Sequence, residues 1–91
     1  MKVVIAGGGR TGAQLARFLI GQSHDVTVVE DRKEVLSRIH RELPTEMIIE
    51  GTPVVPQVLE DAGIQNADVL AAVTTSDETN LVLCYIARKR Y

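Results

Sequence analysis

Aromatic residues are scarce in this chain of 91 residues, and basic residues are absent from a long segment of it. The aromatic residues are Phe18, Tyr85 and Tyr91, whereas a surface that stacks nucleic-acid bases needs several exposed rings. The segment 42–87 contains no lysine or arginine and eight acidic residues, and such a segment repels a phosphate backbone. The sequence therefore argues against DNA or RNA as a partner.

Cysteine and long apolar runs are also nearly absent. Cys84 is the sole cysteine, so no disulfide can form within the chain, which is typical of intracellular proteins. Cys84 lies three residues from both Leu81 and Ala87, and this helical spacing predicts a buried side chain. No apolar run approaches the roughly 20 residues of a transmembrane helix. The opening segment Met1–Ala6 is too short for the apolar core of a signal peptide.

Short β-branched runs alternate along the chain with segments whose apolar residues recur at helical spacing. The composition, 45% apolar and 24% charged, is ordinary for one globular domain. The predicted strands are Lys2–Ala6, Asp25–Glu30, Glu46–Glu50 and Asp68–Val73, and the predicted helices are Arg10–Gln22, Arg32–Leu43, Pro56–Ala62 and Asp77–Lys89. This alternation predicts an α/β fold, a parallel sheet with helices on both faces. We expect a single Rossmann-type domain over residues 1–91, with four strands in the order 3-2-1-4.

A glycine-rich turn separates the first predicted strand from the first predicted helix. Gly7, Gly9 and Gly12 match the pattern G-x-G-x-x-G in the strand–turn–helix context that this pattern requires. The first glycine allows a tight turn, the second lets a pyrophosphate approach the backbone, and the third lets helix and sheet pack closely. A plain turn that happens to contain glycine is the alternative, but the three spacings favour a nucleotide-binding turn.

Acidic residues stand at the end of the second predicted strand. Glu30 follows Gly12 by 18 residues, where a dinucleotide-binding fold has the carboxylate that accepts hydrogen bonds from the adenosine ribose. A carboxylate there repels a 2′-phosphate, so NAD-type ligands are favoured over NADP-type ligands. Asp31 is the alternative residue for this role, and a solvated acid at a strand end is the simpler interpretation. Arg32 either lies over an adenine face or is a solvated residue at a helix start.

Hydroxyl side chains follow the fourth predicted strand. Thr74, Thr75 and Ser76 lie beside the first strand in the expected order, where the sheet of such a fold binds its ligand. Thr75 and Glu78 have the spacing of a capping box, and Thr75 or Ser76 is expected to cap the last helix. The two roles are compatible, because a cap at this place faces the same crevice.

Groups for catalysis are not evident. There is no phosphate loop of the G-x-x-x-x-G-K-[ST] type and no cysteine or histidine spacing of a metal site. His24 and His40 have no nucleophile or carboxylate at a telling distance, so both are interpreted as surface or boundary residues. The sequence therefore favours binding over catalysis.

Three segments carry a more specific pattern than the glycine turn: KVVIAGGGRTG (2–12), HDVTVVEDR (24–32) and LEDAGIQNADVLAAVTTSDETNL (59–81). Together they resemble the nucleotide-binding lobe of Trk/Ktr-type potassium-uptake regulators, the RCK or TrkA N-terminal domains. The resemblance covers essentially the whole chain. It implies a Rossmann lobe that senses NAD(H) or adenine nucleotides without catalysis and that alters a membrane transporter by changing its shape or packing.

The resemblance also implies residue roles. Gly7, Gly9, Arg10, Thr11 and Gly12 would hold the phosphates with Arg10 as charge partner, Glu30 would hold the ribose with Arg32 beside the adenine, and Thr74, Thr75 and Glu78 would lie along the crevice. After the third strand the family has Gly-Asp-x-Thr, which corresponds here to Gly51-Thr52-Pro53-Val54. Gly51 and Thr52 are therefore candidate binding residues, with Thr52 in place of the aspartate that contacts the adenine side.

The family's lobe continues into two further strands and a helix, whereas this chain stops at Tyr91, so we expect a partial Rossmann domain. The expected ligand is NAD(H), with ATP, ADP or AMP as alternatives. The expected partners are a membrane potassium transporter or channel subunit, contacted at the cytoplasmic face, and a second copy of the chain. Two other classes remain open: the cofactor half of an NAD-dependent dehydrogenase, and an assembly module with an empty pocket.

Overall fold

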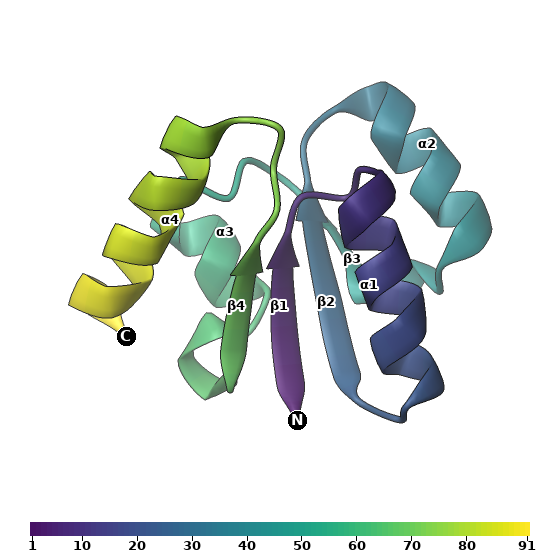
Figure 1. Ribbon diagram of the computed structural model, residues 1–91, viewed down its shortest axis with the longest axis horizontal. Coiled ribbons are helices and arrows are strands. Elements are labelled where there is room, and N and C mark those ends of the chain that lie inside the picture. The colour runs from purple at the N-terminus through teal and green to yellow at the C-terminus, as the bar shows by residue number, and fades with distance from the viewer.

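A parallel sheet of four strands forms the centre of the molecule in the computed structural model, which describes all residues from 1 to 91 (Figure 1). The strands are β1 (Lys2–Ala6), β2 (Asp25–Glu30), β3 (Ile48–Glu50) and β4 (Val69–Ala72). They lie in the order β3-β2-β1-β4, and every neighbouring pair is parallel. The predicted Rossmann-type α/β fold and the strand order 3-2-1-4 are therefore confirmed.

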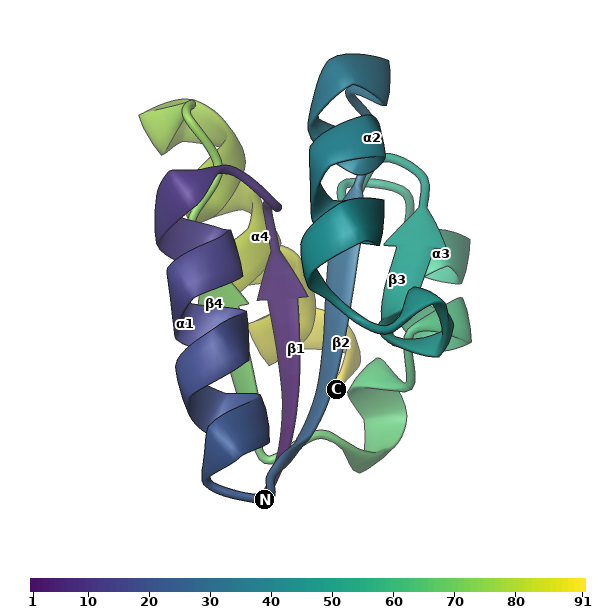
Figure 2. The same ribbon diagram turned by 90° about the vertical axis from the view of Figure 1, so that its right-hand side faces the viewer.

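Four α-helices cover the two faces of the sheet (Figures 1 and 2). Helices α1 (Arg10–Gly21) and α2 (Lys33–Glu42) lie on one face, and α3 (Pro56–Asp61) and α4 (Asp77–Arg90) lie on the other. Short 3₁₀ turns, Thr45–Met47 and Ile64–Asn66, precede β3 and β4. None of the helices has the length and the apolar character needed to cross a membrane. Because all strands run the same way, their carboxyl ends meet at one edge of the sheet, where ligands of such folds bind.

The central strand β1 is buried on both sides. Val3 and Ile5 pack into the cluster under α1 and α2, whereas Val4 and Ala6 pack into the cluster under α3 and α4. All four side chains are buried. This two-sided burial explains why the strand is a continuous apolar run and does not alternate between polar and apolar residues.

The third strand is shorter than the sequence predicts. The predicted strand Glu46–Glu50 begins in the structure at Ile48, because Thr45–Met47 form a 3₁₀ turn. The Met47 amide donates to the carbonyl oxygen of Pro44 at 3.0 Å, so this segment is closed on itself and cannot pair with β2. Pairing of the two strands starts at Val28 and Ile48.

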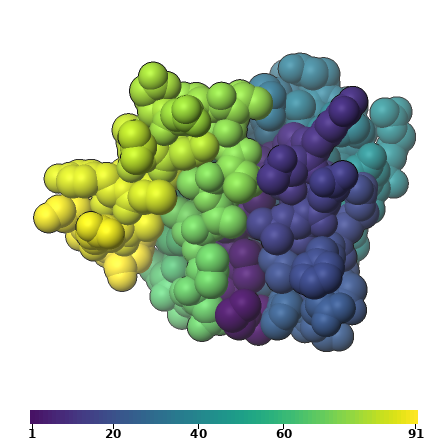
Figure 3. All heavy atoms as spheres, viewed as in Figure 1, coloured from purple at the N-terminus to yellow at the C-terminus, as the bar shows by residue number.

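The prediction that Cys84 is buried is wrong. Helix α4 packs on the sheet through Leu83, which is 0% exposed, and Cys84 is exposed. Leu81, on the predicted stripe with Cys84, is 72% exposed. The apolar stripe of α4 that faces the core is therefore offset from the predicted one. Figure 3 shows α4 (yellow) projecting at the side of the molecule beyond β4 (green).

Candidate functional site

The turn between β1 and α1 requires glycine at two of the three motif positions. Gly7 has a φ of +118°, and a Cβ there would lie 2.8 Å from the carbonyl oxygen of Val73 at the end of β4. A Cβ on Gly12 would overlap the carbonyl oxygen of Gly7. The first turn of α1 therefore lies directly against the glycine turn, and both lie against the end of β4.

Gly9 differs from these two glycines. Its φ of −66° is open to any residue, and the nearest atom to a Cβ built on it is Nη2 of Arg32 at 3.6 Å. The fold itself therefore does not require glycine at this position. Gly9 precedes the first residue of α1, whose first turn has no side-chain cap and no acidic residue. Uncapped N–H groups at a helix start attract anions.

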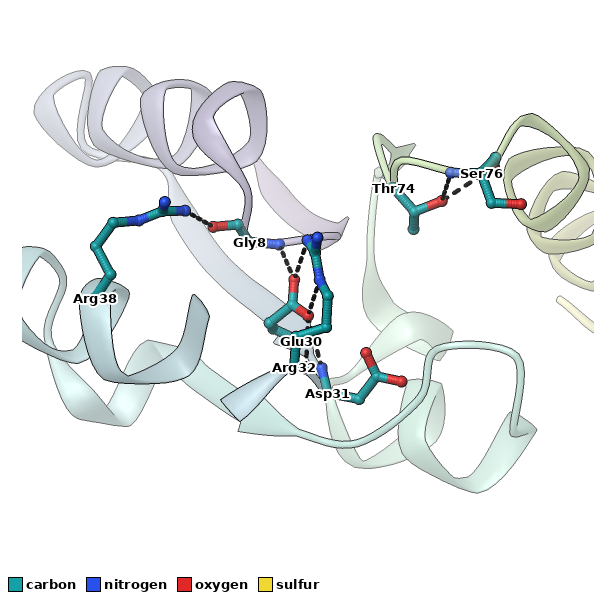
Figure 4. A network of polar contacts seen from close by, with 7 residues as sticks. All are labelled: Gly8, Glu30, Asp31, Arg32, Arg38, Thr74 and Ser76. Atoms are coloured by element: carbon teal, nitrogen blue, oxygen red, sulfur yellow. Dashed lines mark hydrogen bonds and ion pairs between the residues drawn. The ribbon is translucent and has the colours of Figure 1, made fainter. Parts of the chain in front are cut away.

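Gly8 is a residue of the turn that the motif does not single out. Its N–H donates to Oε1 of Glu30 at 2.7 Å, and its carbonyl oxygen accepts from Nη2 of Arg38 at 3.2 Å. A Cβ on Gly8 would lie 2.9 Å from Cδ1 of Ile39. Figure 4 shows Arg38 reaching Gly8 from α2, on the side opposite to Glu30. Gly8 therefore ties the glycine turn to the end of β2 and to α2.

Glu30, the last residue of β2, is buried with 3% of its area exposed. Its Oε1 accepts from Gly8, and its Oε2 accepts from the backbone N–H groups of Asp31 at 3.0 Å and Arg32 at 2.8 Å. The guanidinium of Arg32 donates to Oε2 from Nε at 3.0 Å and to Oε1 from Nη2 at 3.2 Å. Burial alone would raise the pKa of Glu30, but the hydrogen bonds from Arg32 and Gly8 outweigh it and lower the pKa to about 2.

The segment after β4 folds around the Thr74 hydroxyl. This hydroxyl donates toward Oδ1 of Asn80 at 2.7 Å, and the same Asn80 oxygen accepts from the Thr74 N–H at 3.0 Å. Ser76 caps α4, because its Oγ accepts from the backbone N–H of Thr79 at 3.1 Å. The predicted capping box of Thr75 and Glu78 is therefore wrong, and Ser76, the alternative cap, takes the role. Thr75, which stands between Thr74 and Ser76, is exposed.

A cavity of about 200 Å³ opens where these segments meet. Eight of the candidate residues line it: Gly7, Glu30, Asp31, Arg32, Thr52, Thr74, Thr75 and Ser76. Four further lining residues were not among the predicted site residues: Val29, Pro53, Val54 and Thr79. The signal that could have found them is adjacency, because Val29, Pro53 and Thr79 adjoin predicted residues and Val54 lies two residues after Thr52.

Six candidate residues do not line this cavity: Gly9, Arg10, Thr11, Gly12, Gly51 and Glu78. Gly9, Thr11 and Gly12 belong to the turn and the first turn of α1, beside Gly7. Gly51 precedes Thr52, and Glu78 lies on α4, where it accepts a hydrogen bond from Ser76 at 3.3 Å. Arg10 lines a different cleft between α1 and α2, together with Arg17 and Arg38.

The cavity lining is suited to hydrogen bonding. Its titratable residues are Glu30, Asp31 and Arg32, and its other polar side chains are the hydroxyls of Thr52, Thr74, Thr75, Ser76 and Thr79. No group of three or more His, Cys, Asp or Glu residues is arranged to hold a metal ion. Pro53 and Val54 provide an apolar patch on the β3 side. Such a lining can receive a molecule with an apolar ring and several hydroxyl or anionic groups.

The strand order and the glycine turn define the class of this protein as a Rossmann-type α/β domain. A family model described as the TrkA-N domain matches residues 3–91. The chain therefore belongs to the TrkA-N domain family, which confirms the predicted family.

Two longer proteins contain a segment that is similar to this chain. The chain is 38% identical over 87 residues to the Trk system potassium uptake protein TrkA of Vibrio alginolyticus, a match that covers 96% of this chain and 19% of that protein. It is 43% identical over 89 residues to the TrkA homolog of Methanothermobacter thermautotrophicus, covering 98% of this chain and 41% of that one. The chain thus spans less than half the length of these relatives.

A solved structure is also similar in fold. The Kef CTD of Shewanella denitrificans, in its AMP-bound form, superimposes with a TM-score of 0.84 at 23% identity. The match covers 100% of this chain and 54% of that chain. At this identity the similarity supports the fold alone, in agreement with the strand order.

Proposed function

We propose that this chain is a regulatory nucleotide-binding module of a potassium-uptake system and that an adenine nucleotide binds in the cavity. The observation that carries the proposal is the hydrogen bond from the Gly8 N–H of the glycine turn to the carboxylate of Glu30. This contact lies at the edge of a cavity that Gly7 and Glu30 line. In this arrangement the uncapped start of α1 would attract phosphate and Glu30 would accept ribose hydroxyls. The names of the relatives, which are potassium uptake proteins, support the regulatory role.

NAD(H) is the nucleotide that we propose first, with AMP, ADP and ATP as alternatives. The pKa of Glu30, lowered to about 2, keeps this carboxylate charged at neutral pH. A buried negative charge at the ribose position repels the 2′-phosphate of NADP(H) and accepts the 2′-hydroxyl of NAD(H). The AMP in the solved Kef CTD supports an adenine nucleotide in general. Calorimetry should give a weaker affinity for NADPH than for NADH, and equal affinities would contradict the ribose role of Glu30.

We propose binding without turnover. The ionisable groups of the cavity are Glu30, Asp31 and Arg32, and Glu30 titrates too far below neutral pH to exchange a proton there. No histidine or cysteine lines the cavity. NADH incubated with the protein and simple carbonyl compounds should therefore remain unconsumed. Oxidation of NADH that depends on the carbonyl compound would favour the dehydrogenase alternative.

The partners that we propose are a membrane potassium transporter or channel subunit and a second copy of this chain. The first rests on the names of the relatives. The second rests on β4, which pairs with β1 on one side and has no strand on the other, and on the exposed residues Leu81, Val82 and Tyr85 of α4. An unpaired strand edge beside an apolar helix is a template for another chain.

A thermal-shift panel of NAD, NADH, NADP, ATP, ADP and AMP tests the proposed ligand. A ligand that binds the folded state stabilises it by about 2.7 kcal/mol at a hundredfold excess over its dissociation constant. For a domain of this size that stabilisation corresponds to a rise of roughly 10–20 °C in melting temperature. No shift with any of the six would contradict nucleotide binding.

Gly9→Val is the matching variant. The fold leaves room at Gly9, whereas a valine there would fill the space that a phosphate needs beside the backbone. The variant should melt like the parent without ligand and lose the shift with ligand. Gly21→Val is the control, because a Cβ at Gly21, at the far end of α1, meets no atom within 4 Å. A ligand shift that survives in Gly9→Val would move the phosphate site away from this turn.

A further inference from the structure

The carboxylate of Glu30 has no free acceptor position in this structure. A carboxylate offers about four lone-pair sites, and Glu30 accepts three backbone N–H groups together with two N–H groups of the Arg32 guanidinium. The backbone donors belong to the glycine turn and to the start of α2, so they are fixed by the fold. The two donors of the Arg32 side chain are the ones that can leave.

The Arg32 guanidinium lies against Glu30 and close to Gly9 of the glycine turn. It bridges both oxygens of the carboxylate (Figure 4). Its Nη2 lies 3.6 Å from the position that a Cβ on Gly9 would take. The side chain is 38% exposed and forms part of the cavity wall. The cavity of about 200 Å³ is smaller than the sites of about 300 Å³ or more that usually hold small molecules. Movement of this side chain is one way to enlarge it.

We propose that Arg32 is a specificity residue that exchanges partners when a nucleotide binds. Its guanidinium breaks the ion pair with Glu30 and pairs with the phosphate beside Gly9, and Glu30 then accepts hydrogen bonds from the ribose hydroxyls. This inference rests on the proposed function. The exchange replaces one ion pair by another, so a phosphorylated ligand keeps the charge of Arg32 compensated. A nucleoside without phosphate also has to break the Arg32–Glu30 pair but leaves the guanidinium without an anion.

The start of α1 and Arg32 would then hold the same phosphate from two sides. The first turn of α1 offers uncapped N–H groups next to Gly9, and Arg32 reaches the same place from the start of α2. A guanidinium binds phosphate oxygens through paired N–H donors, which a helix start alone does not supply. Arg32 therefore selects for phosphate, whereas Glu30 selects for the ribose.

The backbone donors keep Glu30 in place when the Arg32 side chain is removed. The N–H groups of Gly8, Asp31 and Arg32 remain in an Arg32→Gln variant, so Glu30 keeps three of its five hydrogen bonds. The guanidinium is also partly exposed. The variant should therefore fold, which a thermal melt without ligand checks.

The test compares AMP with adenosine by calorimetry in the parent chain, in Arg32→Gln and in Arg41→Gln. Arg41 is exposed on α2, does not line the cavity and serves as the matched control. The ratio of the adenosine and AMP dissociation constants should fall by about tenfold or more in Arg32→Gln, equivalent to about 1.4 kcal/mol. It should not change in Arg41→Gln. An unchanged ratio in a folded Arg32→Gln variant would overturn the exchange.

A spectroscopic measurement on the parent chain covers the case of an unfolded variant. The Nε–H resonance of Arg32 should shift when AMP is added, because the group changes from a carboxylate to a phosphate partner, and adenosine at equal saturation should give a different shift. Identical shifts with both ligands, or none with AMP, would overturn the inference while AMP binding itself still supported the proposed function. A parent chain that binds neither AMP nor any dinucleotide would overturn both.

Discussion

The two faces of the sheet differ in how completely their side chains are enclosed. Under α1 and α2, eleven buried residues form one cluster, and the Gly8–Arg38 hydrogen bond ties the glycine turn to the helix above that cluster. Under α3 and α4 the cluster has seven buried residues, and the outer surface of α4 leaves Leu81 and Tyr85 exposed. The candidate phosphate side thus rests on the larger core and exposes one large apolar side chain of its helices, Phe18, whereas α4 exposes Leu81, Val82 and Tyr85.

This difference separates two tasks within one small domain. A binding turn has to be held in position before the ligand arrives, because ordering it afterwards costs affinity. A surface that meets another chain gains from apolar area that is not yet buried. The α1–α2 face has the properties required for the first task, and the α4 side has those required for the second.

The largest expected effect is at Gly12, on the α1–α2 face. Gly12→Val places a side chain into the carbonyl group of Gly7, with the Cβ 2.9 Å from the carbonyl carbon. Backbone must move on both sides of the contact, so the free energy of unfolding should fall by more than about 4 kcal/mol. Urea unfolding followed by circular dichroism measures this loss, with Gly21→Val on the same helix as control. A Gly12→Val protein with the parent's midpoint would contradict the close packing of turn and helix.

Two leucines of α4 compare the inner and outer surfaces of one helix. Leu83→Ala removes a side chain that is 0% exposed, and the expected loss is about 2–5 kcal/mol. Leu81→Ala removes one that is 72% exposed, and the expected change is within about 0.5 kcal/mol. Equal losses in urea unfolding of the two variants at low protein concentration would mean that α4 packs in another rotation.

The charge of Glu30 adds a stability that depends on pH. The pKa is lowered from 4.5 to about 2 on folding, so the ionised group favours the folded state by about 3 kcal/mol above pH 4.5. This contribution decreases as the pH falls from 4.5 and is lost near pH 2. Glu30→Gln should therefore be less stable than the parent at pH 7, and most of that difference should vanish at pH 2.5. A difference that stays constant over this range would contradict the lowered pKa.

The smallest effect on folding is expected from Leu81→Glu, which tests the α4 side. The charge lies on the exposed surface of α4, so the free energy of unfolding of the monomer should change by no more than about 0.5 kcal/mol. Self-association, in contrast, should be weakened. Light scattering at about 100 μM should give a larger mass for the parent than for the variant. A monomer mass for the parent would contradict the proposed pairing of two copies.

The fold was predictable because its determinants are local. Each apolar strand and each amphipathic helix can be recognised from a short stretch of sequence. The alternation of strands and helices along the chain then predicts a parallel sheet. The rotation of α4 was not predictable in the same way. Residues Leu81 to Ile86 are all apolar, so the helix has no single apolar stripe, and packing of Leu83 on the sheet decides which side is buried.

Some features of the candidate site were likewise predictable from the sequence, and others depend on packing. Gly7, Glu30 and Thr74 were found because strand ends mark where a ligand would meet the sheet, and all three line the cavity. The contact from Arg38 to Gly8 joins residues 30 positions apart and depends on how α2 lies over the turn. The ion pair between Arg32 and Glu30 depends on a side-chain rotamer that no sequence pattern specifies.

The central position of β1 has a consequence for synthesis on the ribosome. The strand pairs with β2 from Lys2 and Asp25 onward, but its other edge pairs with β4, where Val3 meets Val69. A nascent chain grows at about 5–20 residues per second, so the second edge of β1 waits roughly 3–13 s for its partner strand. During that interval the most buried strand of the finished domain has one row of amide and carbonyl groups still bonded to water.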